Sequence, residues 1–70
     1  MIEPRLYYCY AYIDLETGEC VGVRQMNIAN DHPALIPIPV YDEEYGGKYY
    51  INGAWYEDAE GIIPWTSSLL

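Results

Sequence analysis

The stretch that decides the fold is YDEEYGGKYYINGAWYED, residues 41–58, and its strongest signal is Asn52-Gly53. Both central residues of a type I′ turn need positive φ, and Asn-Gly adopts that conformation at the least cost. A two-residue loop fixes the register, so we expect strands over residues 48–51 and 54–57. The predicted cross-strand pairs are Ile51 with Ala54, Tyr50 with Trp55, Tyr49 with Tyr56 and Lys48 with Glu57.

The first half of the chain predicts a second hairpin. Residues 6–13 are rich in aromatic and β-branched residues and contain no breaker, which favours a strand. A polar loop ends at Gly18, and an αL glycine there leads into a second strand over residues 20–26. The expected pairs are Ala11 with Val23 and Ile13 with Val21 on one face, and Tyr12 with Gly22 and Tyr10 with Arg24 on the other.

The two cysteines are expected to be free thiols in a reducing compartment. The predicted register places Cys9 and Cys20 on opposite faces of the sheet, where they cannot reach disulfide geometry. A catalytic cysteine would need a base, and His32 is the single histidine. Nothing in the spacing joins either thiol to His32, so we interpret the cysteines as structural and the histidine as an exposed loop residue.

The middle of the chain links the two hairpins. Residues 26–34 predict a crossover loop with Ile28 tucked under the sheet. Residues 35–40 predict an edge strand, because Pro37 and Pro39 lack the amide donor that a central strand needs. Asp42 is expected to cap one short helical turn near residues 42–45, with Gly46 as its αL stop.

These elements make the predicted fold all-β: a small antiparallel sheet of two hairpins, with an edge strand and one short helical turn. Residues 1–70 form one domain, with a flexible tail over residues 66–70. A domain this small is marginally stable alone, so we expect support from a protein partner or a homo-oligomer. Tyrosine and tryptophan suit such contacts. The candidate partner-binding residues are Tyr8, Tyr10, Tyr12, Tyr50, Trp55 and Trp65.

Composition and motifs argue against several function classes. Eleven acids against three bases give a net charge of −8, which opposes direct binding to nucleic acid or to anionic membranes. No apolar run reaches the length of a membrane span and no export leader is visible, so a cytoplasmic location is expected. Phosphate loops, Cys-x-x-Cys, paired histidines and a Ser-His-Asp set are all missing. We therefore expect a non-enzymatic protein without catalytic residues, cofactor or metal.

Residues 41–58 resemble a pattern found in small proteins and C-terminal modules of tailed-bacteriophage tail and tail-fibre regions. That pattern runs Asp-x-x-Tyr-x-Gly-Lys-x-Tyr into Asn-Gly-x-Trp. Its positions are occupied here by Asp42, Tyr45, Gly47, Lys48, Tyr50, Asn52, Gly53 and Trp55. The resemblance implies a phage or prophage product attached to the tail or encoded beside it, in the host cytoplasm or in the virion. It carries over no catalytic residue.

Three functions are open at this point. The first is a non-enzymatic phage structural or accessory protein that acts through protein–protein contacts. The second is an acidic, anti-CRISPR-like inhibitor of a host defence nuclease, which presents carboxylates to a basic host protein in place of nucleic acid. The third is a glycan-binding module that uses aromatic faces with nearby carboxylates. The acidic surface expected for the second function comprises Asp42, Glu43, Glu44, Glu57, Asp58 and Glu60.

Overall fold

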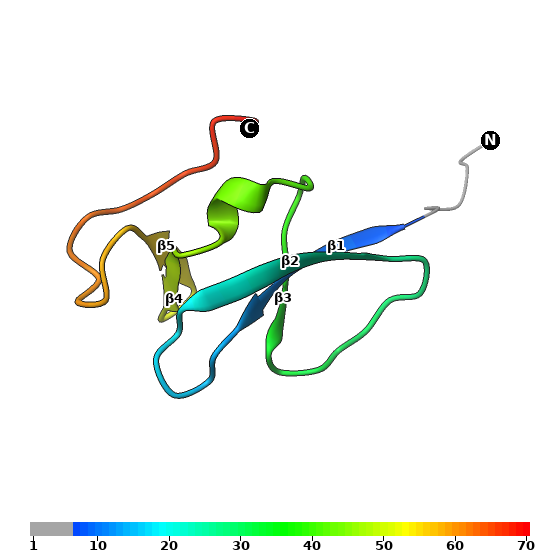
Figure 1. Cartoon of the computed structure of the whole chain (residues 1–70), viewed down its shortest axis with the longest axis horizontal. Helices are drawn as coiled ribbons and strands as arrows, with labels where there is room; N and C mark the ends of the chain where they lie inside the picture. The colour runs from blue at the N-terminus through cyan, green and yellow to red at the C-terminus, as the bar shows by residue number, and fades with distance from the viewer. Residues whose placement is uncertain (1–6) are drawn as a thin grey trace.

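The computed structural model describes residues 7–70 and shows an all-β chain, as predicted (Figure 1). Leu6, the first residue of the first expected strand, lies outside the described residues. Residues 7–70 contain no α-helix and form five antiparallel strands with one 3-10 turn. The elements in chain order are β1 (Tyr8–Ile13), β2 (Cys20–Met26), β3 (Leu35–Pro37), η1 (Glu43–Tyr45), β4 (Tyr49–Ile51) and β5 (Ala54–Tyr56).

The Asn-Gly hairpin is confirmed in both turn and register. Asn52 and Gly53 have φ of 49° and 83°, and β4 pairs with β5 from Tyr49–Tyr56 to Ile51–Ala54. Each strand is one residue shorter than expected. The ammonium of Lys48, which was expected to face Glu57, lies instead 5.2 Å from the centre of the Trp65 ring.

The first hairpin departs from its predicted register at one position. Gly18 has the expected positive φ of 81°, and the three pairs nearest the middle of β1 are as predicted. The expected pairing of Ile13 with Val21 is wrong, because a β-bulge shifts the register and pairs Ile13 with Cys20. The bulge leaves the Val21 side chain 63% exposed and turns Cys20 toward the core. Arg24 pairs with Tyr10 as predicted, and its guanidinium group lies 5.2 Å from the centre of the Tyr12 ring.

Cys9 and Cys20 are both free, but for another reason than the one expected. The bulge puts them on the same face, within one buried cluster. Cys20 pairs with Ile13, which is four residues from Cys9 along β1, or about 13 Å at the rise of a strand. That separation is far beyond the reach of a disulfide.

β3 is an edge strand, as predicted, since the larger sheet has the order β2-β1-β3. It ends at Pro37 rather than at residue 40. Pro37 pairs with Tyr10, and the neighbouring Ile38 N–H donates to the Cys9 carbonyl at 3.0 Å. Because hydrogen-bonded and non-bonded positions alternate, the nitrogen of Pro37 faces the free edge. Ile28 is 72% exposed, so its expected place under the sheet is wrong.

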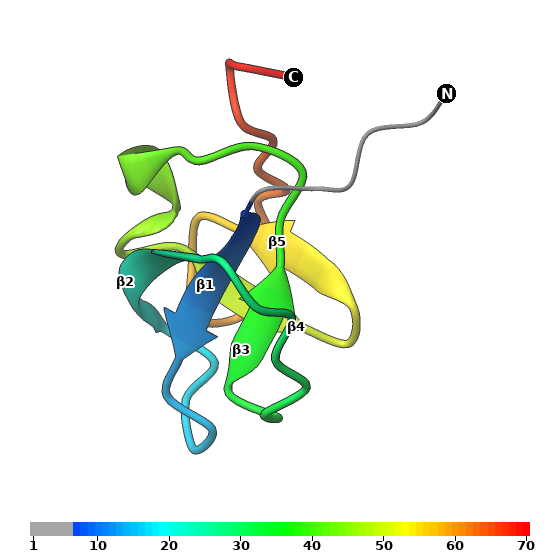
Figure 2. The same cartoon turned by 90° about the vertical axis from the view of Figure 1, so that its right-hand side faces the viewer.

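The two hairpins lie in separate sheets rather than in the single sheet expected, and the two sheets meet at the start of β2. Glu19 bridges Tyr49, the Cys20 N–H donates to the Lys48 carbonyl at 2.7 Å, and the Tyr50 N–H donates to the Gly18 carbonyl at 2.8 Å. These bonds attach β4 and β5 to the outer edge of β2. The two views show the β4–β5 pair turned across the end of the larger sheet (Figures 1 and 2).

The helical turn is capped as expected but stops differently. The Glu44 N–H donates to Asp42 Oδ1 at 2.9 Å, which confirms Asp42 as the cap. Gly46 has φ of −58°, so it is not the αL residue; Gly47 is, with φ of 86°. The Gly47 N–H then donates to the Cys20 carbonyl at 2.9 Å, which fixes η1 beside β2.

Candidate binding groove

An aromatic cluster stands at the centre of the second half of the chain. Tyr45, at the end of η1, is 3% exposed and lies between two tryptophans. The Trp55 ring is 4.9 Å from it and the Trp65 ring 4.8 Å, both edge to face. Such pairs contribute about 0.5–1.5 kcal/mol each beyond their buried area. Burial, followed by the charge of Asp42, raises the pKa of Tyr45.

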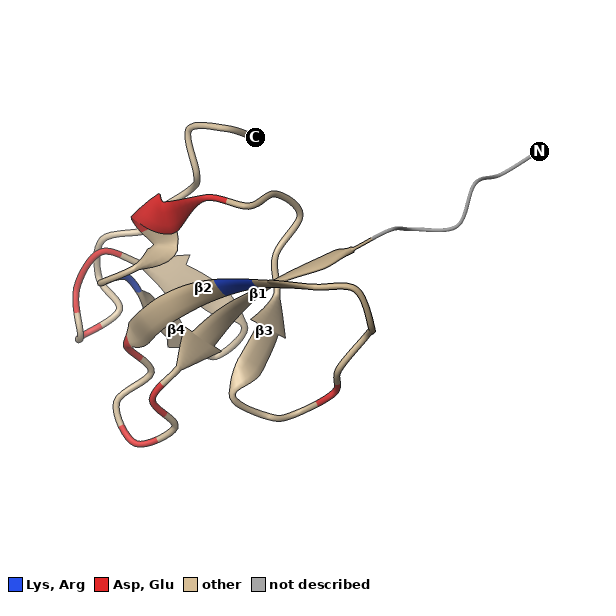
Figure 3. Cartoon of the chain, turned by 45° about the vertical axis from the view of Figure 1, so that its right-hand side comes forward, with Lys and Arg blue, Asp and Glu red and all other residues tan. Residues whose placement is uncertain are grey.

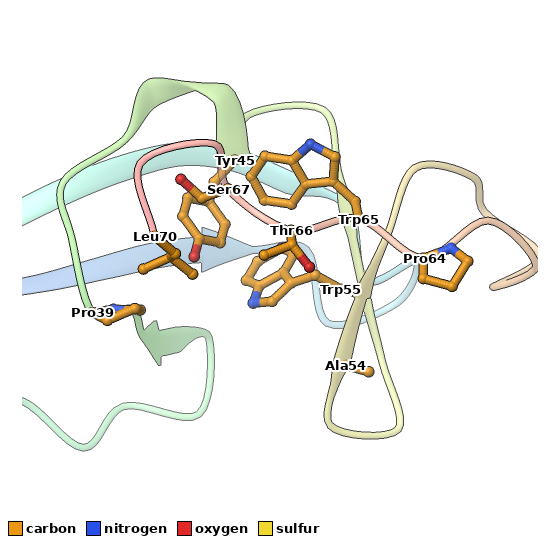
Figure 4. Close-up of a pocket in the computed structure, with 9 residues that line it drawn as sticks. All are labelled: Pro39, Tyr45, Ala54, Trp55, Pro64, Trp65, Thr66, Ser67 and Leu70. Atoms are coloured by element: carbon orange, nitrogen blue, oxygen red, sulfur yellow. The ribbon is translucent and has the colours of Figure 1, made fainter.

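A groove of about 390 Å³ opens over this cluster (Figure 4). It lies between the segment after β3, β5 and the end of the chain. Both tryptophans are half-buried, so each has one part in the core and another part at the groove. The groove is mainly apolar, and the residues that give it this character are Pro39, Tyr45, Trp55, Pro64, Trp65 and Leu70.

Two tryptophans that line the groove have indole N–H groups without a hydrogen-bond partner in residues 7–70. Within residues 7–70, neither the Trp55 nor the Trp65 indole N–H has a hydrogen-bond acceptor, and neither nitrogen is fully buried. Figure 4 shows the Trp55 nitrogen and the Tyr45 hydroxyl on the side of Pro39 and Leu70. A tryptophan N–H without a partner is suited to a ligand carbonyl.

One wall of the groove is the C-terminal segment, which Asp42 holds in place. The Ser67 hydroxyl donates to Asp42 Oδ2, and both side chains are buried. Ser67 Oγ in turn accepts from the Leu69 N–H at 3.1 Å. The acid that caps η1 therefore also positions Thr66, Ser67 and Leu70 along the groove.

The segment that leads into this wall is extended and runs antiparallel to β5 (Figure 4). Tyr56 bridges Pro64, and the Trp65 N–H donates to the Trp55 carbonyl at 3.0 Å. Asp58 supports this segment, since its Oδ1 accepts from the N–H groups of Ile62 at 3.0 Å and Ile63 at 2.8 Å. The Ile63 N–H is the main cause that lowers the pKa of Asp58.

The six predicted partner-binding residues separate into two groups. Tyr50, Trp55 and Trp65 pack against the core, and the two tryptophans line the groove. Tyr12 is exposed, Tyr8 is half-buried, and Tyr10 is buried with its hydroxyl accepting from the Asn30 N–H at 2.9 Å. Since side chains alternate along a strand, the tyrosines of β1 face away from the buried cluster that contains Ala11.

Sequence reasoning missed Tyr45 as a site residue, and also the pairing of Asp42 with Ser67. The signal for Tyr45 was its place at the end of a capped turn, one turn after Tyr41. Only Tyr45 is buried, whereas Tyr41 is exposed. Nothing in the local pattern pointed to Ser67, because the bond spans 25 positions of the chain.

The predicted acidic surface is reduced by one residue, since Asp42 is buried. Glu43, Glu44, Glu57 and Glu60 are exposed, and Asp58 is half-buried. Figure 3 shows acidic residues on η1, on the loop after β5 and on the loop between β1 and β2, toward the same end of the molecule.

Residues 7–70 form neither a metal-binding cluster nor a helix that could cross a membrane. No three histidine, cysteine, aspartate or glutamate side chains of this part gather as a metal ion would require. None of its helical segments is long and apolar enough to cross a membrane. The chain matches no protein-family model, no curated protein and no solved structure.

Proposed function

We propose that this protein is non-enzymatic and acts through protein–protein contacts, with the aromatic groove as its contact surface. The observation that carries the proposal is the pair Trp55 and Trp65, which border an open groove and whose indole N–H groups have no acceptor in the described part of the chain. Tryptophan dominates the binding energy of many interfaces, because it buries a large apolar area and still offers one donor. The half-buried rings are already ordered by the core, so binding costs little conformational entropy.

The setting we propose is a bacteriophage tail or tail fibre, and the protein is a structural or accessory component there. This part rests on the resemblance of residues 41–58. Residues of that pattern build the groove: Asp42 holds the C-terminal wall, Tyr45 and Trp55 form the aromatic cluster, and Lys48 covers Trp65. The pattern therefore supports a binding role better than an incidental hairpin would.

The direct test is association with bacteriophage tail proteins. Sedimentation velocity of the mixture should show a complex that Leu70→Ser weakens, because Leu70 lines the groove. The matched control is Ile28→Ser, which removes an equally exposed apolar side chain outside the groove lining. A stable monomer with no affinity for tail proteins would contradict the proposal.

A second candidate is the acidic inhibitor of a host defence nuclease. The observation in its favour is that exposed carboxylates gather toward one end of the molecule (Figure 3). Binding to a basic host protein should then weaken steeply with salt. Replacing Glu43 and Glu44 by lysine should abolish inhibition, whereas Asp31→Lys, in the loop before β3, should preserve it. Inhibition that is affected neither by salt concentration nor by the Glu43 and Glu44 substitutions would exclude this candidate.

A further inference from the structure

We propose that the groove binds an extended polyproline II segment flanked by basic residues. This inference rests on the proposed function and names the chemistry of its partner. Three observations support it: prolines at the two sheet edges formed by β3 and by the segment beside β5, the composition of the groove, and the acids at its rims.

The first observation concerns the sheet edges, where an extended partner could add as a strand. Pro37 occupies the free edge of β3 with its nitrogen facing outward. Pro64 does the same at the other edge: its neighbours bond to β5 through the Ile63 carbonyl and the Trp65 N–H, so its own nitrogen faces away from β5. Each edge therefore lacks a donor where strand addition needs one. A partner that approaches either of these two edges must be recognised through side chains instead.

The second observation concerns what the groove offers. A polyproline II helix has no internal hydrogen bonds, presents its carbonyls to the surroundings and packs its rings into aromatic-lined grooves. The groove supplies the rings of Tyr45, Trp55 and Trp65 together with those of Pro39 and Pro64. The unused Trp55 N–H supplies a donor for a peptide carbonyl.

The third observation is the charge at the rims. Glu44 lies beside the C-terminal wall, since the Ser68 hydroxyl contacts its Oε1 at 3.4 Å. Asp58 lies beside the segment that carries Pro64, where it accepts from the Ile63 N–H. The chain as a whole carries −8. Arginine or lysine on either side of the proline segment would complement these carboxylates.

The test uses the full chain and a short synthetic peptide with a Pro-x-x-Pro core flanked by arginines. The protein has two tryptophans and both line the groove, so tryptophan fluorescence reports binding directly. We expect a saturable fluorescence change that is lost when the prolines become alanine and weakened when the arginines become glutamate. Leu70→Ser should raise Kd about tenfold, a typical effect of removing an apolar contact. Ile28→Ser should leave Kd unchanged.

A second variant tests the hydrogen bond. Trp55→Phe keeps an aromatic ring in the core cluster but removes the indole N–H, so it should raise Kd several-fold while the chain stays folded. Equal affinity of Trp55→Phe and the original chain would overturn the donor's role. Equal affinity for the alanine peptide would overturn the polyproline proposal, as would binding of glycans in its place.

The outcomes also separate this inference from the function on which it rests. If Leu70→Ser abolishes contact with tail proteins but no proline peptide binds, the inference fails and the proposed function stands. If Leu70→Ser instead dissociates a homodimer, the occupant is a second copy and the inference fails. If Leu70→Ser and Ile28→Ser have the same effect in every binding assay, both the inference and the proposed function fail.

Discussion

The Ser67 hydroxyl donates a hydrogen bond to the Asp42 carboxylate across 25 positions of the chain, and both side chains are buried. The same carboxylate accepts the Glu44 N–H, so one acid both starts η1 and anchors the C-terminal segment. Tyr45 follows Glu44 at the end of η1 and contacts both tryptophans. The shape of the groove thus depends on a polar pair that no local sequence pattern reveals.

Loss of this hydrogen bond should destabilise the protein. Ser67→Ala leaves one oxygen of buried Asp42 without its partner, which costs about 1–3 kcal/mol. Urea unfolding followed by tryptophan fluorescence measures the change. Ser68→Ala is the matched control, because Ser68 is exposed and its contact with Glu44 is long, at 3.4 Å; its effect should stay below about 0.5 kcal/mol. Equal stabilities of the two variants would contradict the anchoring role.

The junction between the two hairpins should tolerate no side chain at Gly18. A Cβ there would lie 2.7 Å from the Tyr50 carbonyl oxygen, and the residue has positive φ. Gly53 also has positive φ, but a Cβ on it meets nothing within 4 Å. Gly53→Ala should therefore cost about 1–2 kcal/mol from backbone strain alone. Gly18→Ala should cost roughly 3 kcal/mol or more, because main chain must move as well. Thermal unfolding of both variants compares them.

Local signals in this chain predicted local structure well. Asn52-Gly53 specified the turn, the register and the strand pairs, because two adjacent residues with positive φ are typical of a two-residue type I′ turn, which fixes the register of the hairpin. Pro37 correctly marked an edge. The cap at Asp42 was also correct, since its bond to Glu44 spans two residues.

What failed depended on contacts between distant segments. The loop sequence between β1 and β2 is equally compatible with a regular register, so it does not predict the bulge at Ile13. The bulge turns the side chain of Cys20 toward the core, where it is buried. The groove requires residues from 39 to 70 to meet, which hydrophobic periodicity does not specify. The six expected contact residues shared an aromatic character rather than a location, so the fold divides them between two faces.

The stability of the protein should fall in alkaline solution in two steps. Burial raises the pKa of the Cys20 thiol, so the unfolded chain loses this proton first as pH passes the ordinary value of about 8.5. The raised pKa of Tyr45 acts in the same direction above about pH 10. Free energies of unfolding measured across this range should decline less steeply in Cys20→Ala from about pH 8.5, and less steeply in Tyr45→Phe above about pH 10. Unchanged slopes in both variants would show that these groups do not control the decline.

The edge prolines should keep the chain from pairing with copies of itself. Pro37→Thr and Pro64→Thr each restore an outward N–H on a free edge, which completes the donor row that strand addition needs. Each variant should fold, with a change in unfolding free energy within about 1 kcal/mol, since the original nitrogen bonds to nothing. In sedimentation velocity both should associate further as concentration rises. Pro33→Thr is the control, because Pro33 is exposed in the loop before β3 and borders no strand edge. If all three variants show the same sedimentation behaviour, Pro37 and Pro64 do not protect the sheet edges from self-association.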